Sequence, residues 1–183
     1  MNADKKIFSM QWHFTDGCDQ ACQHCYIYQN AGYLKESKKE LSLEEAKSVV
    51  DNFVSFCEQM ECEPRLSITG GDPLLYKYFW EVLSYISSKG IIFSILGNPF
   101  HLNKKVCDKL KEMGCVSYQM SLDGLEKTHD GIRKNGSFKA TLEKIPLLKE
   151  FGIKANIMTT VSKLNYLEIP ELVRIVVENK VDT

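Results

Sequence analysis

The sequence lacks any long apolar segment. No stretch approaches the roughly 18 consecutive apolar residues that a membrane-spanning helix needs. The N-terminal residues, MNADKKIFSMQWHF, also lack the apolar run of a signal peptide. We therefore predict a cytoplasmic protein without a membrane partner. In that compartment the seven cysteines are expected to be reduced, metal-bound or buried rather than joined in disulfides.

An excess of charge of either sign is also missing. The 23 lysines and arginines nearly balance the 24 aspartates and glutamates, giving a formal net charge of -1, and no basic block stands out. Because a surface that binds nucleic acid normally carries a basic patch, we predict no nucleic-acid partner. Linkers, low-complexity tracts and short repeats are absent as well. A hydrophobic content of 44% is typical of one globular domain with its own core.

Short apolar runs alternate with longer amphipathic segments along the whole chain. Strands are predicted at residues 7–14, 65–69, 91–96, 115–122 and 153–161. Helices are predicted at residues 41–60, 76–90, 103–114, 137–152 and 166–180. Five consecutive strand–helix units predict an α/β fold with a parallel sheet and helices outside it.

Two local features refine this prediction. Ser42 and Glu45 have the spacing of a capping box, which predicts a helix start. Pro146 lies inside the fourth predicted helix and is expected to kink it or split its ends. The chain is shorter than the about 250 residues of a closed eight-unit barrel, so a partial barrel or an open doubly wound sheet fits better. A sixth strand is expected to begin near the last residues, VENKVDT, so we expect a fragment of a longer protein.

Three cysteines, Cys18, Cys22 and Cys25, follow the first predicted strand in a CxxxCxxC spacing. The spacing suits one face of a helix, but the preceding TDG and the polar residues between the cysteines favour a loop. A structural zinc site needs four ligands, and His24, the nearest candidate, sits awkwardly between two of the cysteines. An iron–sulfur cluster held by three thiolates would leave one iron open for a substrate or cofactor. This third interpretation explains the odd number of thiols, and we favour it.

Two further segments resemble those of a known family. ITGGDPLL (residues 68–75) follows the second strand, and SLDGLEKTHDGIRKNGSF (residues 121–138) follows the fourth. With the cysteine loop they resemble the radical S-adenosylmethionine (radical SAM) enzymes, in particular peptide maturases that carry a C-terminal SPASM-type domain. Asp72 stands where this family usually has Glu. The resemblance implies an incomplete partial TIM barrel, with about five of the six βα units of a radical SAM core. Residues 1–183 would form that core domain, truncated at its C-terminal end, and the SPASM-type domain would be absent.

The resemblance also implies the cofactors and their ligands. A [4Fe-4S] cluster would be held by Cys18, Cys22 and Cys25, and S-adenosyl-L-methionine would bind its open iron. An electron donor such as a flavodoxin or ferredoxin would reduce the cluster, and the cleaved cofactor would yield a 5′-deoxyadenosyl radical. The residues implied to contact S-adenosylmethionine are His24, Tyr26, Gly70, Gly71, Asp72, Asn98, Ser121 and Arg133.

Each of these contacts has a plainer alternative. GGDP occurs most often as a simple turn, Ser121 and Asp123 could form a polar turn, and Arg133 could be a solvated charge. His129 and Asp130 are expected to hold the loop rather than to bind a ligand. The GGDP segment, Ser121 and Arg133 nevertheless follow the carboxyl ends of predicted parallel strands. This position favours a binding site, because α/β folds build their sites there.

The resemblance extends to the substrate. It is strongest to maturases that form thioether crosslinks in ribosomally made, cysteine-containing peptides, so a precursor peptide is the implied substrate. The alternatives are a sulfatase-type maturase that forms formylglycine and another radical SAM enzyme, such as one of cofactor biosynthesis. A non-catalytic iron–sulfur carrier or a zinc-binding module is an alternative of another class. A carrier should supply four protein ligands, which this motif does not.

Overall fold

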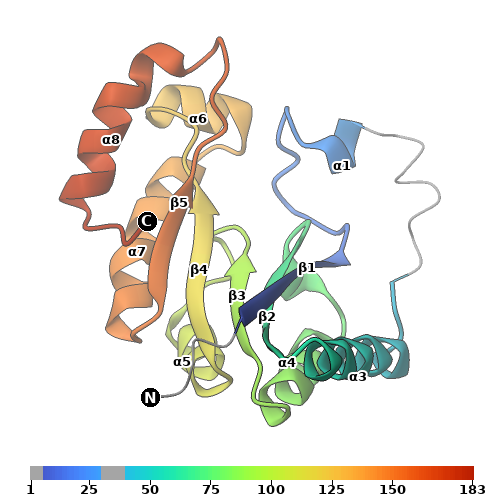
Figure 1. Ribbon diagram of the computed structural model, residues 1–183. Coiled ribbons are helices and arrows are strands. Elements are labelled where there is room, and N and C mark those ends of the chain that lie inside the picture. Colours follow the sequence, from blue (N-terminus) through green and yellow to red (C-terminus); the bar gives the residue numbers. More distant parts are fainter. Residues whose placement is uncertain (1–5, 30–39) are drawn as a thin grey trace.

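A five-stranded parallel sheet forms the framework of the computed structural model, which describes residues 6–29 and 40–183 (Figure 1). Its strands are β1 (Lys6–Thr15), β2 (Cys62–Gly70), β3 (Ile92–Leu96), β4 (Cys115–Ser121) and β5 (Lys154–Met158). They lie in the order β1-β2-β3-β4-β5, and every neighbouring pair is parallel. This sequential order is that of a barrel, since a doubly wound sheet reverses its order at a switch point. The sheet is not closed, so the fold is the predicted partial barrel.

Helices connect successive strands and confirm the predicted alternation. The longer ones are α3 (Leu43–Gln59), α4 (Phe79–Ser88), α5 (Lys104–Glu112), α7 (Ser137–Glu150) and α8 (Ile169–Glu178). The short helices are α1 (Tyr26–Gln29), α6 (Glu126–Ile132) and the 3₁₀ turns η1 (Pro73–Leu75) and η2 (Tyr166–Glu168). The sequence did not predict α1 and α6, because four and seven residues are too few to show a helical period. Within the described ranges, no helix is long and apolar enough to cross a membrane.

Helix α3 begins with the predicted capping box. The Ser42 hydroxyl accepts a hydrogen bond from the Glu45 backbone N–H, and the Glu45 carboxylate accepts one from the Ser42 N–H at 2.8 Å. Helix α7 is one helix from Ser137 to Glu150 with Pro146 inside it, so the predicted split of its ends is wrong, and the alternative, a kink at the proline, stays a prediction. Ile145 and Leu148 on either side of the proline are fully buried. Their packing against the sheet outweighs the missing hydrogen bond of the proline.

The two faces of the sheet differ in chemistry. Side chains that point toward the helices form the main core, including Leu66, Ile68, Phe93, Ile95 and Tyr118. The alternate residues point the other way, because successive side chains of a strand face opposite sides. Most of them are polar, and Ile92, Leu96 and Met158 are apolar exceptions on this face. One row of aligned partners on this polar face runs Gln11, Ser67, Ser94, Ser117 and Lys154 across all five strands. The Ser117 hydroxyl donates to the Ser94 hydroxyl at 2.8 Å.

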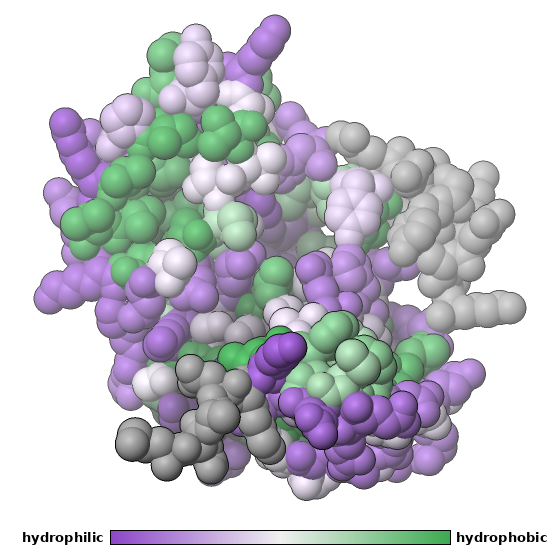
Figure 2. Space-filling model, viewed as in Figure 1, coloured by the Kyte–Doolittle hydropathy of each residue, from purple (hydrophilic) through white to green (hydrophobic). Residues whose placement is uncertain are grey.

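Helix α8 and the segment before it expose several apolar side chains. Leu172 of α8 is buried in a small second cluster with Leu122 and Phe138. Leu167 and Val177 are 76% and 69% exposed. Figure 2 shows the hydrophobic side chains gathered over α8 at the upper left of the molecule. Helix α8 therefore buries only one part of its apolar surface.

Two glycines at the end of β2 let the cysteine loop run against the sheet. The backbone N–H of Gly71 donates to the Thr15 carbonyl, and that of Asp72 donates to the Gly17 carbonyl, both at 2.7 Å. A Cβ atom on Gly70 would lie 2.2 Å from the Thr15 oxygen, and one on Gly71 would lie 2.2 Å from the Gly17 oxygen. Gly70 also has a φ of 132°, which side chains disfavour. The start of the loop can occupy this position only because neither residue has a side chain.

We predict that Gly71→Ala lowers the free energy of unfolding by about 2 kcal/mol, since the new methyl group would push against backbone that cannot turn aside. Gly131→Ala is the matched control, because nothing lies within 4 Å of an added Cβ in that helical position. The control should be neutral or more stable by up to about 1 kcal/mol. Urea unfolding of both variants measures this. Equal stability of the two variants would show that the close approach does not constrain the loop.

Candidate functional site

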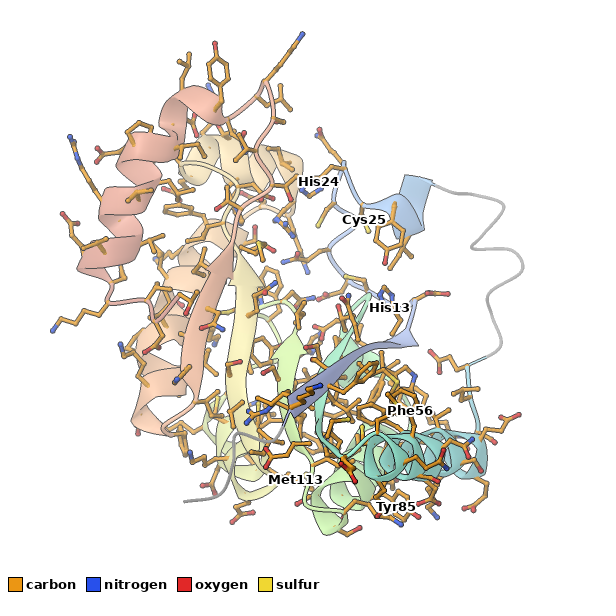
Figure 3. All side chains as sticks on the ribbon, viewed as in Figure 1. His13, His24, Cys25, Phe56, Tyr85 and Met113 are labelled. Carbon is orange, nitrogen blue, oxygen red and sulfur yellow. The ribbon has the colours of Figure 1, made fainter. Side chains whose placement is uncertain are left out.

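A cavity of about 310 Å³ lies where the cysteine loop meets the carboxyl ends of the strands. Figure 3 shows His24 and Cys25 beyond the end of β1 that carries His13. Every residue predicted for the site except Asp72 lines this cavity: Cys18, Cys22, Cys25, His24, Tyr26, Gly70, Gly71, Asn98, Ser121 and Arg133. Segments far apart in the sequence are thus brought together at one place. Thr69, Gln119 and Thr160 also line it and were not predicted.

The three motif cysteines lie on one short loop, and none of them is in a disulfide. Cys22 is 8% exposed, and Cys18 and Cys25 are half-buried. Burial raises the pKa of Cys18 and of Cys22, and the charge of Arg133 partly offsets the effect at Cys22. A hydrogen bond from the Cys25 N–H to the Cys22 carbonyl, at 3.0 Å, turns the chain between these two thiols.

A structural zinc site would need a fourth ligand besides the three thiolates. His24, the possible fourth ligand, has its Nε2 atom 3.1 Å from a carboxylate oxygen of Asp123 instead. Three thiolates with one open position match a four-iron cluster, in which each thiolate binds a separate iron, better than a closed zinc site.

The loop is also fixed on the side away from the glycines. The backbone N–H of Gln23 donates to the Ile132 carbonyl at 2.8 Å, and its side-chain amide donates to the Gly131 carbonyl at 2.7 Å. Ala21 has a φ of 49°, in the left-handed region. The loop between Cys18 and Cys25 is therefore held between the end of β2 and the end of α6. Tyr26 follows it, and its hydroxyl lies 3.2 Å from Nδ1 of His13.

A buried carboxylate that the sequence did not identify organises the far wall of the cavity. Asp123 is fully buried; its Oδ2 atom accepts from Nε of Arg133 at 2.5 Å, and its Oδ1 atom accepts from the Thr160 N–H at 2.8 Å. Burial raises the pKa of Asp123, but the charge and hydrogen bond of Arg133 outweigh it, so that pKa lies below its usual value. Arg133 is thus neither solvated nor free to turn. Asp123 is more than the turn residue considered above.

His129 and Asp130 have structural contacts, in agreement with the prediction for them. Nδ1 of the fully buried His129 accepts from the Asp123 N–H at 2.9 Å. The Asp130 carboxylate accepts from the N–H groups of Gly136 and Phe138, which fixes the start of α7. Burial, reinforced by the charge of Arg133, lowers the pKa of His129 to about 4. The ring is therefore neutral near pH 7.

Asp72 does not line the cavity. Its Oδ1 atom accepts from the Leu74 N–H at 3.1 Å and caps η1, and its Oδ2 atom is buried without a hydrogen-bond partner. Burial raises the pKa of Asp72 to about 6. Asp19 and His101 lie close to it, with one ligand atom from each of the three residues within 4.8 Å. The side chain is turned behind the cavity wall, and only the backbone of the GGD segment approaches the cavity.

Comparison with known families decides what this arrangement is. The profile described as the radical SAM superfamily matches residues 12–176, which is most of the chain. The chain belongs to the radical SAM superfamily. Structures of the same fold hold S-adenosylmethionine or a [4Fe-4S] cluster, in agreement with the cofactors predicted from the sequence. Membership of this superfamily favours an iron–sulfur cluster over a structural zinc site at the three cysteines.

Several relatives cover nearly the whole chain. Fe-coproporphyrin III synthase from Methanosarcina barkeri is 32% identical over 171 residues, 93% of this chain and 41% of that protein. Mycofactocin maturase MftC from Mycolicibacterium smegmatis is 28% identical, over 88% of this chain and 40% of that protein. The crystal structure of Streptococcus suis SuiB bound to S-adenosylmethionine has a TM-score of 0.75 and 20% identity, covering 97% of this chain and 40% of that one. The chain thus spans about two fifths of the length of these relatives. Their names indicate more than one type of reaction.

We predict that His129 makes the protein less stable in weak acid. Its pKa is about 4 in the folded protein and about 6.5 in an unfolded chain, so unfolding takes up a proton between these values. The stability from the neutral ring is full above pH 6.5, falls as the pH drops and is lost by pH 4, an effect of about 3 kcal/mol.

The comparison with His129→Asn isolates this effect, since Asn offers an acceptor but does not titrate. Asp72, whose pKa is raised to about 6, contributes in the opposite direction, because its neutral form is favoured by folding as the pH falls. The measurement is the free energy of unfolding in urea at pH 4 to 7, compared between the wild type and His129→Asn at each pH. A difference that does not change with pH would contradict a neutral, buried His129.

Proposed function

We propose that this chain is the catalytic core of a radical SAM enzyme that crosslinks a ribosomally made, cysteine-containing peptide through a thioether bond. Residues 1–183 would form one radical SAM core domain. Its partners would be a precursor peptide and a one-electron donor such as a flavodoxin or ferredoxin. The cytoplasmic location expected from the sequence belongs to the same proposal, because a low-potential cluster needs a reducing compartment.

The cavity residues would hold the cofactors. Cys18, Cys22 and Cys25 would bind the [4Fe-4S] cluster, which leaves one iron for S-adenosylmethionine. When bound, the pair supplies a 5′-deoxyadenosyl radical that removes a hydrogen atom from a carbon of the substrate. The half-open wall formed by the loop and the strand ends would keep water from this reaction.

Separate parts of the wall would hold separate parts of S-adenosylmethionine. The bare backbone of Gly70 and Gly71 would allow the methionine end to approach closely. His24 and Tyr26, beside the last cysteine, would line the adenine. Ser121 and Arg133 would bind ribose or carboxylate oxygens, with the guanidinium already oriented by Asp123.

The polar face of the sheet carries the proposal for a peptide substrate. Gln119 of this face lines the cavity, and the aligned row of Gln11, Ser67 and Ser94 lies farther back along the strands. All four are neutral hydrogen-bonding side chains that are exposed or half-buried. Such groups match the N–H and C=O groups of an extended peptide. A porphyrin would instead need a broad apolar wall and several cations for its carboxylates. The similarity to a peptide maturase supports the same substrate.

Porphyrin chemistry is the second candidate, favoured by the 32% identity with Fe-coproporphyrin III synthase. Two basic residues of the polar face, Arg65 and Lys154, could pair with porphyrin carboxylates. Both lie away from the carboxyl ends of their strands, at a distance from the cysteines. A sulfatase-type maturase would also act on a polypeptide and would differ in its product.

A competition between the two substrate classes tests the proposal. The anaerobically reconstituted chain, with a strong reductant and S-adenosylmethionine, is offered a cysteine-containing peptide encoded beside its gene, or coproporphyrin. We expect 5′-deoxyadenosine with the peptide and a peptide mass lower by two hydrogen atoms, because a C–H and an S–H bond become one C–S bond. The 5′-deoxyadenosyl radical would take the hydrogen atom from carbon, the thiol would lose its proton, and the remaining electron would return to the oxidised [4Fe-4S] cluster. The Cys22→Ala variant should give neither product, whereas Cys62→Ala, at a cysteine outside the cavity, should keep both.

A change in porphyrin mass with an unchanged peptide would overturn the peptide substrate and favour the second candidate. Conversion of a cysteine to formylglycine would retain the peptide substrate but replace the crosslinking reaction. Release of 5′-deoxyadenosine by Cys22→Ala would contradict the site itself.

A further inference from the structure

Two of the cysteine sulfurs receive side-chain N–H donors from outside their loop. Nη1 of Arg133 lies 3.6 Å from the sulfur of Cys22, and Nδ2 of Asn98 lies 3.9 Å from the sulfur of Cys18. Arg133 ends α6, and Asn98 follows β3, so the donors come from two separate parts of the fold. The two sulfurs are therefore approached by donors from two different elements of the cavity lining.

Asn98 is held firmly in this position. Its Nδ2 atom also donates to Oδ1 of Asp19 at 2.9 Å, and its Oδ1 atom accepts from the Phe100 N–H at 3.2 Å. Its carbonyl accepts from the hydroxyl of the fully buried Tyr118 at 3.1 Å. The side chain is 6% exposed. An amide with both ends bonded cannot turn its donor away from Cys18 without losing these contacts.

Arg133 is held in the same manner by a different carboxylate. Its Nε atom donates to Asp123, which is fully buried and also bonded to the Thr160 N–H. The guanidinium is planar, so fixing Nε on Asp123 also fixes the direction of Nη1 toward Cys22. Its side chain is 14% exposed, so water screens its charge weakly at the sulfur.

We propose that Asn98 and Arg133 are positioning residues that raise the reduction potential of the cluster. This rests on the cluster assignment of the proposed function. One electron from the flavodoxin- or ferredoxin-type donor makes the cluster and its thiolates more negative. N–H donors and a nearby positive charge stabilise that reduced form more than the oxidised form. Arg133 should have the larger effect, since a charged donor forms the stronger hydrogen bond.

This role is separate from binding S-adenosylmethionine. If Arg133 served only the methionine carboxylate, its removal would weaken cofactor binding but leave the cluster potential unchanged without that cofactor. If it acts on Cys22, the potential changes in the absence of S-adenosylmethionine. The decisive reading is thus the midpoint potential of the cluster alone.

An EPR-monitored redox titration of the reconstituted full chain, without S-adenosylmethionine, tests the inference. Arg133→Gln should lower the reduced-to-oxidised ratio at the wild-type midpoint about tenfold, which is a shift of ~59 mV for one electron. Asn98→Ala should shift the midpoint in the same direction by less. Lys127→Gln is the matched control: it removes the same charge from an exposed side chain of α6, the helix that Arg133 ends. We expect it to stay near wild type.

The possible outcomes separate this inference from the proposed function. Unchanged midpoints in Arg133→Gln and Asn98→Ala, with wild-type iron content, would overturn the inference alone. So would an equal shift in Lys127→Gln, which would indicate a general effect of charge. A wild-type chain that takes up no four-iron cluster would defeat the proposed function and the inference with it. Should Arg133→Gln lose its iron, Arg133→Lys and Asn98→Ala provide the same comparison.

Discussion

The buried carboxylate of Asp123 is the interaction on which the geometry of the site depends. It joins Arg133 at the end of α6, His24 in the cysteine loop and the backbone of Thr160 after β5. A carboxylate removed from water costs several kcal/mol unless charges and donors compensate it. If these partners moved away, the carboxylate would be left buried without compensating charges and hydrogen-bond donors. The cysteine loop, α6 and the carboxyl end of the sheet are thus fixed relative to one another by residues of the chain itself.

The sheet provides the second constraint, because its two faces have different partners. Parallel sheets are usually apolar and covered on both faces, but here the helices cover one face and the other is mostly polar. The close approach of Thr15 and Gly17 to the paired glycines brings the cysteine loop to the end of this polar face. A substrate on that face would lie beside the cofactors, and its own polar groups would replace the water that it displaces.

Much of the architecture could be predicted, because it depends on patterns that are local in the sequence. The five strand–helix units and the cysteine loop after β1 were predicted, and the fold confirms them. Strand β2 begins at Cys62 rather than at residue 65, since Pro64 lies where β2 pairs with β1 but not yet with β3. The contacts of Asp123 and the turning of Asp72 behind the cavity wall could not be predicted. Both depend on which backbone N–H groups the fold brings to a carboxylate, and one sequence does not reveal that.

The most direct test of the account is an iron count with EPR spectra of the reduced, anaerobically reconstituted chain, recorded with and without S-adenosylmethionine. The account predicts about four irons per chain, their loss when Cys18, Cys22 or Cys25 is replaced by alanine, and a spectrum that changes when S-adenosylmethionine is added. A single zinc ion in the folded chain, or a cluster whose spectrum is indifferent to S-adenosylmethionine, would contradict an open iron in this cavity.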